Sequence, residues 1–440
     1  MLAKRIGGLI LAISLATNST IGQQVVNLED AIGAALQNNY DILLVRNDSA
    51  SAALDKSYIY GAFLPTLNGT ATRLWNANNQ KQKLADGSER EANNVKSNNL
   101  AASLLLNWTL FNGFKMFATK TKVEQMAQLG ELSVKNQVVN TVADIVNNYY
   151  LVVRQKQQLK AIQDQMSISE ERVKLAERKL SVGLGTRPEL LQARLDLNAQ
   201  KAQTLQQESL ISQLKEQLNQ KTGLQLPPIF DVSDSIPLHL SLQMEDIQKD
   251  IEQSSPTLLM AQKNLDISKS ILRENKGDLW PVISFNSAYN FTRNDNKTVV
   301  NPFVPLFSLN KGYNFGFTAS IPILNNMNTR RLINQAKLGI SYQTVYLQQQ
   351  KTAVNVSVRI AYMNYQYAVS ALKLEDENIQ LAKDNVMIAL ERFKQGVSTY
   401  LELREAQKSL EDAYDRLIAA RYNTKLSEVE LLRLKGELVK

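Results

Sequence analysis

The sequence predicts a mainly helical protein with membrane β-structure, built from two copies of one unit: helix, strand, strand, very long helix, shorter helix. Three observations predict this fold: a repeated turn, two proline-free helical runs of roughly 70 residues, and four segments that alternate apolar and polar residues. The turn GLGTRPELLQA at 183–193 returns as GVSTYLELREA at 396–406. In each copy a glycine can end one helix, and Thr followed by Glu three residues later can cap the next. Each copy is therefore predicted to be the tip of a helical hairpin.

The composition excludes several classes of chemistry. The 440 residues contain no cysteine and one histidine, His239, and carry a net charge of +8. These counts exclude a disulfide scaffold, a thiolate nucleophile, a cysteine zinc site and any triad with a second imidazole. The basic residues are dispersed among amides and acids, which is typical of solvated helix faces and not of a nucleic-acid interface. We expect no enzyme, no cofactor, no metal and no nucleic-acid partner, and interpret His239 as a linker histidine.

The N-terminal residues have the order of a secretory signal peptide. Lys4 and Arg5 precede an apolar run at 6–16 and small residues near Gly22. We therefore predict a signal peptide at 1–22, with an apolar part too short to span a bilayer. No cysteine follows that could carry a lipid, and no later segment has 18 consecutive apolar residues. A membrane-embedded mature protein would have to be a β-barrel.

The first repeat is predicted at 23–226. Its helix begins at Leu28, where Asn27 can act as N-cap, and runs to about Gly61. The other predicted elements are a strand at about 65–76, an exposed polar loop at 77–96, a strand at about 98–111, and a helical hairpin at 114–222 with its tip at 183–186. Leucine and valine recur every seven residues in the hairpin, so its helices need helical partners along their length.

A linker at 227–243, with three prolines, separates the repeats. The second repeat, 244–440, is predicted to follow the order of the first. Its elements are a helix at 244–277, strands at about 281–293 and 312–324, and a helical hairpin at 328–435 with its tip at 396–399. In each repeat the combined length of the two shorter helices matches the length of the long helix. We therefore expect the two shorter helices to stack end to end beside the long one.

The four strands each have one apolar face and one face of Asn, Ser, Thr and Gly, which is typical of a membrane barrel wall. A soluble sandwich with aromatic core residues is the alternative, but four strands leave no second sheet to pack on. The aromatic residues expected at the membrane interface are Trp75, Trp108, Trp280, Tyr289, Tyr313 and Phe315. The loop at 299–307 is unusually apolar for an exposed loop, and the sequence gives no account of it.

Four strands are too few to close a barrel, since about eight is the smallest number. An open sheet edge is not viable in lipid, so the strand count predicts an oligomer. Three copies would give about twelve strands and two would give about eight. The long helices carry too many Lys, Glu, Gln and Asn residues to cross a membrane. They must extend on the order of 100 Å into an aqueous space, as a barrel of coiled-coil hairpins.

These features together resemble the TolC-like outer-membrane efflux protein family. The resemblance rests on the duplicated layout, the signal peptide, Leu64-Pro65, Trp280-Pro281, the segment WTLFNG at 108–113 and the two tips, and covers about Leu28 to Gly436. It implies a homotrimer with a 12-stranded outer-membrane β-barrel continuous with a periplasmic α-helical barrel. Such proteins are exit ducts of tripartite efflux pumps or of type I protein secretion. Their implied partners are a periplasmic adaptor, an inner-membrane transporter and outer-membrane lipid.

The resemblance also implies two sets of site residues. Adaptor contact falls on the tips, at Gly183, Gly185, Thr186, Gly396, Ser398 and Thr399. The pore constriction falls on Glu402 and Glu405, which share a helix face, with Glu189 at the equivalent place in the first repeat. The compared family member has Asp at the first two positions and Arg in the turn where this chain has Ser398, so the closed entrance is expected to be latched differently. An ordinary solvated face near Arg404 is the alternative for the two acids.

Two further alternatives remain open from the residues. A secreted coiled-coil scaffold or adhesin with a small β-tip would also have long amphipathic helices, but the four alternating strands argue against it. A duct for heavy metals would have the same architecture, although no cluster of His or Met supports that subclass.

Overall fold

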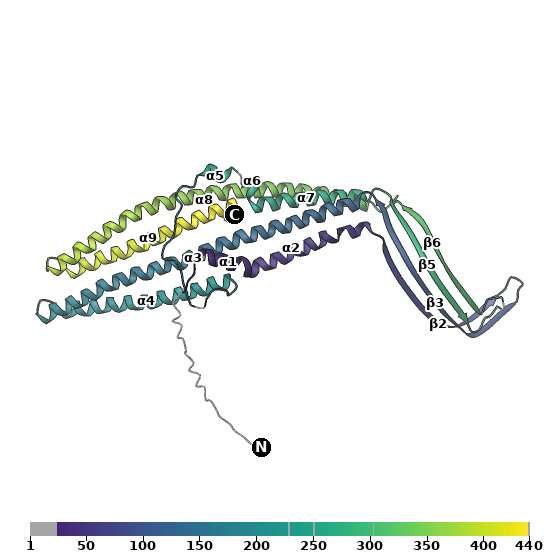
Figure 1. Cartoon of the computed structure of the whole chain (residues 1–440), viewed down its shortest axis with the longest axis horizontal. Helices are drawn as coiled ribbons and strands as arrows, with labels where there is room; N and C mark the ends of the chain where they lie inside the picture. Colours follow the sequence, from purple (N-terminus) through teal and green to yellow (C-terminus); the bar gives the residue numbers. More distant parts are fainter. Residues whose placement is uncertain (1–23, 228, 250, 302, 439–440) are drawn as a thin grey trace, which may run out of the picture. The chain divides into compact units, whose positions relative to one another are not determined.

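The computed structural model describes residues 24–227, 229–249, 251–301 and 303–438 (Figure 1). The predicted signal peptide at 1–22 lies outside these residues. The first half contains β1 (Gln24–Val25), α1 (Leu28–Asn38), α2 (Tyr40–Tyr58), a 3-10 turn (Ile59–Phe63), β2 (Thr66–Lys83), β3 (Glu89–Asn112), α3 (Lys115–Ser181) and α4 (Arg187–Lys221). The second contains β4 (Phe230–Asp231), α5 (Met244–Gln248), α6 (Ile251–Ser254), α7 (Pro256–Gly277), β5 (Val282–Asn296), β6 (Phe307–Ser320), α8 (Asn328–Lys394) and α9 (Tyr400–Lys435).

The predicted duplicated unit is confirmed: helices, two strands, a 67-residue helix and a shorter helix occur twice. The chain packs as two compact units, and each takes segments from both halves. Among the described residues, the hairpin unit comprises 24–40, Thr141–Leu242 and Tyr362–Glu430. The sheet unit comprises Asp41–Asn140, Gln243–Ala361 and Leu431–Lys440. The repeat boundaries at 23–226 and 244–440 stay a prediction.

The predicted single helix at 28–61 is wrong, because the chain breaks at Asn39. This residue is extended, with ψ 126°, and its side-chain amide donates to the carbonyl of Lys221 at the end of α4 (2.8 Å). Gly223 follows with φ +71°, and a Cβ there would lie 2.6 Å from the Asn38 carbonyl oxygen. The end of α1 therefore meets the end of α4, which fixes where the two helices abut.

The predicted helix at 244–277 is likewise interrupted, and α7 begins anew after Ser255. Ser255 is extended (ψ 114°), as expected of a residue before proline, here Pro256. Gly436, with φ +78°, lies against this break, since a Cβ there would be 2.7 Å from the Ser254 carbonyl oxygen. In each half of the chain, a glycine that follows the second hairpin helix therefore packs against the point where the helix before the strands is interrupted.

The four long strands form one antiparallel sheet in the order β2-β3-β5-β6. The predicted loop at 77–96 is wrong, since β2 continues to Lys83 and pairs with β3 from Glu89. Backbone pairing sustains this extension, in which Val95 is buried but most other side chains are exposed, so the hydropathy pattern does not reveal it. The last strand was predicted at 312–324 but begins at Phe307 and ends at Ser320. The Ile321-Pro322 sequence that follows cannot continue the strand, because proline lacks the backbone donor.

The register confirms the predicted separation of faces. Leu104, Tyr289 and Tyr313 lie opposite one another across three strands. On the other face, the hydroxyls of Thr70 and Ser103 are 2.8 Å apart. The side chains of the apolar face are exposed, Tyr313 by 77%, so they are not the core of a soluble sandwich.

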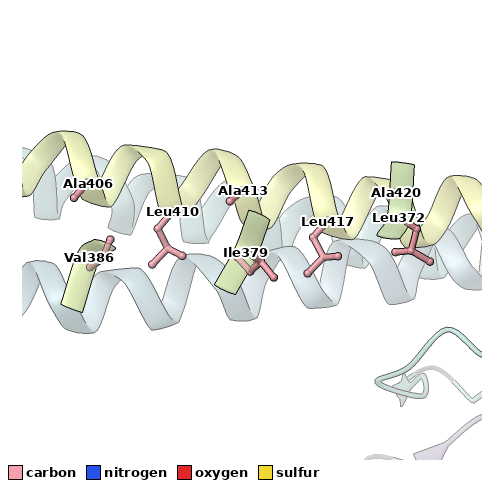
Figure 2. Packing of buried hydrophobic residues seen from close by; sticks show 8 residues of the cluster. All are labelled: Leu372, Ile379, Val386, Ala406, Leu410, Ala413, Leu417 and Ala420. Carbon is pink, nitrogen blue, oxygen red and sulfur yellow. The ribbon is translucent and has the colours of Figure 1, made fainter. Parts of the chain in front are cut away.

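The α8–α9 hairpin is held by apolar residues that recur every seven residues (Figure 2). The buried cluster contains Leu372, Ile379 and Val386 from α8 and Ala406, Leu410, Ala413, Leu417 and Ala420 from α9. Alanine and leucine alternate along α9 against the larger side chains of α8, which permits the close packing of a coiled coil.

The predicted linker at 227–243 is fastened to the helices of the hairpin unit. Lys156 of α3 forms ion pairs with Asp231 (2.5 Å) and Asp234 (2.6 Å). The backbone N–H of His239 donates to a carboxylate oxygen of Glu428 on α9 (3.1 Å), and the imidazole Nδ1 lies 3.2 Å from the other. His239 is therefore a contact of a buried acid as well as a linker residue.

Both strand-to-helix junctions use two consecutive left-handed residues. They are Gly113 (φ +66°) and Phe114 (φ +64°) before α3, and Asn326 (φ +54°) and Met327 (φ +59°) before α8. Non-glycine residues adopt this region at a cost. At Gly113 the space is closed too, since a Cβ would lie 2.2 Å from the Gly277 carbonyl oxygen.

Gly113→Ala should therefore destabilise the sheet unit by roughly 2 kcal/mol or more, through left-handed strain and the clash together. Gly87→Ala is the matched control, because Gly87 also has a positive φ (+83°) but open space around it, so it should cost only about 1 kcal/mol. Thermal unfolding followed by circular dichroism measures both. Equal losses for the two variants would contradict the role of the close approach.

Candidate functional site

The first hairpin tip has the predicted geometry. Gly183 adopts φ +74°, and the backbone N–H groups of Leu184 and Gly185 both donate to the carbonyl of Lys179, at 2.8 and 3.0 Å. A Cβ on Gly185 would lie 2.9 Å from the Cβ of Lys179. Both glycines are therefore required, one for its backbone angle and the other for space.

The capping box that begins α4 is confirmed. The N–H of Thr186 donates to a carboxylate oxygen of Glu189 at 3.2 Å, and the Thr186 side chain accepts from the backbone of the same residue. The carboxylate of Glu189 therefore has a structural contact of its own, whatever its place in a pore.

The second tip repeats this turn with Val397 in place of Leu184 and Ser398 in place of Gly185. Gly396 has φ +74°, and the N–H of Val397 donates to the Arg392 carbonyl at 2.9 Å. The hydroxyl of Thr399 accepts from the N–H of Glu402 at 3.3 Å and caps α9. Ser398 stands where the first tip has Gly185, and its buried hydroxyl has no hydrogen-bond partner among the residues that the structure describes.

The two tips are joined to each other. The ammonium of Lys179, at the end of α3, donates to the carbonyl of Phe393, at the end of α8, at 3.1 Å. It also lies 3.9 Å from the centre of the Phe393 ring, a cation–π contact. The last turns of the two long helices are therefore in direct contact.

Glu402 and Glu405 lie together on an exposed face of α9, while their neighbours Leu403 and Ala406 are buried. In the part of the chain that the structure describes, neither acid forms an ion pair. Arg404, which lies between them in sequence, instead reaches Asp196 (Nε to Oδ2, 3.6 Å). The structure thus brings two of the three predicted acids together and leaves their charge uncompensated.

A network that the sequence did not predict lies beside these acids. Arg172 of α3 is 2% exposed, and its guanidinium donates to Asp196 of α4 (2.8 Å) and to Gln407 of α9 (2.8 Å). The hydroxyl of Tyr400 donates to the same oxygen of Asp196 at 2.8 Å. The Tyr400 ring lies 5.0 Å from the Arg172 guanidinium carbon. One buried cation therefore joins three helices from both hairpins.

The network shifts two acid–base equilibria. Burial opposes the ionisation of Asp196, but hydrogen bonds from Tyr400 and Gln192 and the charges of Arg172 and Arg404 outweigh it, so the pKa of Asp196 is lowered. Burial, reinforced by the hydrogen bond to Asp196, raises the pKa of Tyr400 to about 12. Asp196 is therefore an anion, and Tyr400 a neutral donor, across the physiological range.

A signal for this network was present in the sequence. The buried stripe of α3 is apolar at Val146, Tyr149 and Val153, but continues towards the tip as Gln165, Ser169 and Arg172. Polar residues at the spacing of a buried stripe indicate a polar contact between helices. Because Arg is common on solvated helix faces, the residue type alone did not reveal it.

All six predicted interface aromatics, Trp75, Trp108, Trp280, Tyr289, Tyr313 and Phe315, are exposed. Trp108 has a second role, because its indole N–H donates to the Phe63 carbonyl at 2.8 Å and ties β3 to the turn before β2. Among the described residues, the helices include none that is both long enough and apolar enough to cross a membrane.

The sequence matches the family described as outer membrane efflux protein over residues 31–224 and 248–437, most of the chain. The chain belongs to this family. It is 21% identical over 416 residues to the outer membrane protein TolC of Vibrio cholerae, covering 94% of this chain and 91% of that protein. It is 19% identical over 411 residues to the alkaline protease secretion protein AprF of Pseudomonas aeruginosa, covering 90% and 83%.

The fold of the outer membrane efflux proteins is evident in solved structures too. The Campylobacter jejuni CmeC outer membrane channel superposes with a TM-score of 0.78 at 18% identity, covering 94% of this chain and 86% of that one. The predicted resemblance is thereby confirmed, as is the location in the outer membrane with a periplasmic helical part. The family consists of channels rather than enzymes.

The lowered pKa of Asp196 predicts a pH-dependent contribution to stability. Asp196→Asn should lower the free energy of unfolding by roughly 3 kcal/mol at neutral pH, because it leaves the charge of Arg172 buried and less well paired. Because folding lowers the pKa of Asp196, its carboxylate stabilises the folded protein at pH values above the ordinary pKa of 3.8. This stabilisation is lost as the pH falls through the pKa that Asp196 has in the folded protein. The difference between wild type and variant should thus shrink below about pH 4.

The control is Asp164→Asn, which removes an exposed carboxylate from α3. It should change stability little at any pH. Thermal unfolding at pH 3 to 8 makes the comparison, and a wild-type to Asp196→Asn difference that is constant over that range would contradict the prediction.

Proposed function

We propose that this protein is the outer-membrane exit duct of a tripartite efflux pump. It passively conducts drugs or other solutes from a periplasmic adaptor and an inner-membrane transporter to the outside. The observation that carries the proposal is the family match over both halves of the chain, including both hairpin tips. Outer membrane efflux proteins work with an adaptor and an inner-membrane pump, and the tips are the part of this chain best suited to meet one.

A second function, the exit duct for type I protein secretion, is favoured by one observation. The AprF relative is named as a protease secretion protein and matches 90% of this chain. The two functions need the same duct and differ in the inner-membrane transporter that loads it.

Two exposed surfaces support assembly as a homotrimer. Within the described residues, β2 and β6 pair on one side only, so each leaves an unpaired backbone edge. Helix α8 carries a second apolar stripe that is exposed along most of its length. Its members are Leu338, Tyr342, Val345, Val356, Ile360, Met363, Tyr367, Leu374, Leu381 and Ile388. Neighbouring copies would cover both the edges and the stripe.

Within such a duct, Glu402 and Glu405 are proposed to line the pore constriction, and Glu189 to contribute less because its carboxylate caps α4. The proposed adaptor contacts are Gly183, Gly185, Thr186, Gly396, Ser398 and Thr399. The Arg172 network would resist separation of the two hairpins near the entrance, so opening would require its hydrogen bonds to exchange. The exposed aromatics of the sheet would contact membrane lipid.

The architecture is tested by membrane fractionation and unheated gel electrophoresis. We expect an outer-membrane trimer, and Tyr367→Glu should convert it to monomers by placing a charge in the exposed stripe of α8. Gln366→Glu is the matched control, because Gln366 is an exposed polar residue of the same helix that is not a member of the apolar stripe, so the variant should leave the trimer intact. A soluble wild-type monomer would refute the proposed function, since no closed duct could then form.

The constriction is tested by single-channel conductance of the double variant Glu402→Gln/Glu405→Gln. Removing the paired carboxylates should weaken cation selectivity and block by divalent cations, because rings of acids favour cations at a narrow point. The control, Glu208→Gln/Glu216→Gln, removes the same charge from α4, away from the tips. Unchanged selectivity in the first variant would eliminate Glu402 and Glu405 as pore residues.

A further inference from the structure

We propose that the apolar face of the sheet ends in a binding site for a phosphate-bearing membrane lipid. Arg73, Lys96 and Lys297 would hold the phosphate, and an adjacent groove would hold an acyl chain. The site lies toward the end of the sheet that carries the β2–β3 and β5–β6 turns. It rests on the proposed function in one respect, that the sheet is embedded in the outer membrane.

The register places the three cations on the apolar face. Arg73 pairs with Leu100, and Ala77, four residues further along the same face of β2, pairs with Lys96. The N–H of Lys297 donates to the carbonyl of Lys96 at 2.9 Å, which continues the β3–β5 register. Lys96 and Lys297 are therefore direct cross-strand neighbours.

Two like charges at directly opposed positions destabilise a sheet. Violations of this kind are expected where a site requires them. An anion between Lys96 and Lys297 would turn the repulsion into attraction, so the pair itself points to an anionic ligand.

The three cations also lack acidic partners. Among residues 24–227, 229–249, 251–301 and 303–438, none of the ion pairs involves Arg73, Lys96 or Lys297. Arg73 donates instead to the neutral amide of Asn98 (3.1 Å). By contrast, Arg293, which lies on the same face, is paired with Asp295 at 2.9 Å. The face therefore keeps a local excess of positive charge.

Two of the three cations, Lys96 and Lys297, line a hollow of about 260 Å³. Trp75, Lys96, Asn98 and Lys297 line it, and the guanidinium of Arg73 lies 4.8 Å from the centre of the Trp75 ring. The ring holds the guanidinium beside the hollow, where its planar donors fit two oxygens of a phosphate. A carboxylate would suit one donor pair, whereas a phosphate offers oxygens to all three cations.

A second, apolar hollow of about 400 Å³ lies on the sheet at the next positions along the strands. Its floor is made of small residues, Gly69, Ala71 and Ala102, and its sides include Leu104 and Tyr289. Gly69 and Ala71 precede Arg73 in β2 at two-residue steps, so all three lie on the same face of the strand and the groove continues from the cations. A groove floored by small residues between large ones fits a linear hydrocarbon chain.

The two hollows together select the ligand. A free phosphate ion would use the cations and leave the groove empty, and a neutral lipid would use the groove and leave the cations unpaired. Only an amphiphile with a phosphate headgroup and an acyl chain satisfies both. We therefore assign the site to a phosphorylated lipid of the membrane in which the sheet lies.

The test uses the purified full-length protein in neutral detergent with a chelator present, and native mass spectrometry to count bound lipid. The probes are lipid A with its phosphates, the same lipid with the phosphates removed, and inorganic phosphate. We expect retention of phosphorylated lipid A, weaker retention of the dephosphorylated form, and no retention of inorganic phosphate.

Arg73→Gln/Lys96→Gln/Lys297→Gln should weaken binding of phosphorylated lipid A by about fivefold for each cation removed. Ala102→Leu, which fills the groove and leaves the charges in place, should weaken binding of both lipids. The matched control is Lys174→Gln/Lys201→Gln/Lys263→Gln, which removes the same charge from helices and should bind as wild type does.

Equal retention of the two lipids, or full retention by the Arg73 triple variant, would overturn the proposal. Retention of inorganic phosphate would replace it with a simple anion site. Outer-membrane fractionation of cells that produce the same variants separates this outcome from failure of the proposed function, because loss of the lipid site leaves the trimer in the outer membrane.

Discussion

A helix of 67 residues is stable in water only if other helices cover an apolar stripe along its length, and this constraint governs the whole chain. In each half the chain provides shorter helices for this purpose, α4 or α9 after the tip and a broken helical run before the strands. The junctions at Asn39 and Ser255 are where the shorter helices abut, and Gly223 and Gly436 allow the close approach there. The hairpin tips and the helix interruptions therefore follow from the need to cover the apolar stripes of the two long helices.

The same constraint explains why polar groups appear inside the coiled coil. A continuous apolar seam can slip by a heptad, whereas a buried polar contact matches only one alignment. Arg172 reaches Asp196, Gln407 and the Tyr400 ring only in one alignment of α3 with α4 and α9. Such a group contributes little net stability compared with apolar packing, but it fixes the relative positions of the hairpins.

The sequence predicted those features that arise from local chemistry. The tips at Gly183 and Gly396 followed from cap and turn residues, and the alternation around Tyr289 and Tyr313 correctly separated the faces of the sheet. It missed features that depend on distant partners. The strand beyond Asn78 is held by backbone pairing, which leaves no hydropathy pattern, and the break at Asn39 depends on an amide that reaches Lys221 in another helix.

The same distinction between local chemistry and distant partners applies to the candidate site. Glu402 and Glu405 were predictable as neighbours because three residues of helix place them on one face. Arg172 was not, because its partners come from sequence positions 24 and 235 residues away. The cations Lys96 and Lys297 escaped notice for the same reason, since a cross-strand pair exists only once the register is known.

The two tips of one chain share a backbone path but differ in sequence, for example at Gly185 against Ser398. In the proposed trimer the ring of tips would therefore contain two kinds in alternation. Its true symmetry is threefold, although its backbone is close to sixfold. A partner that contacts every tip must then either be threefold itself or use two different binding modes, so the sequence difference between the two tips limits the stoichiometry of docking.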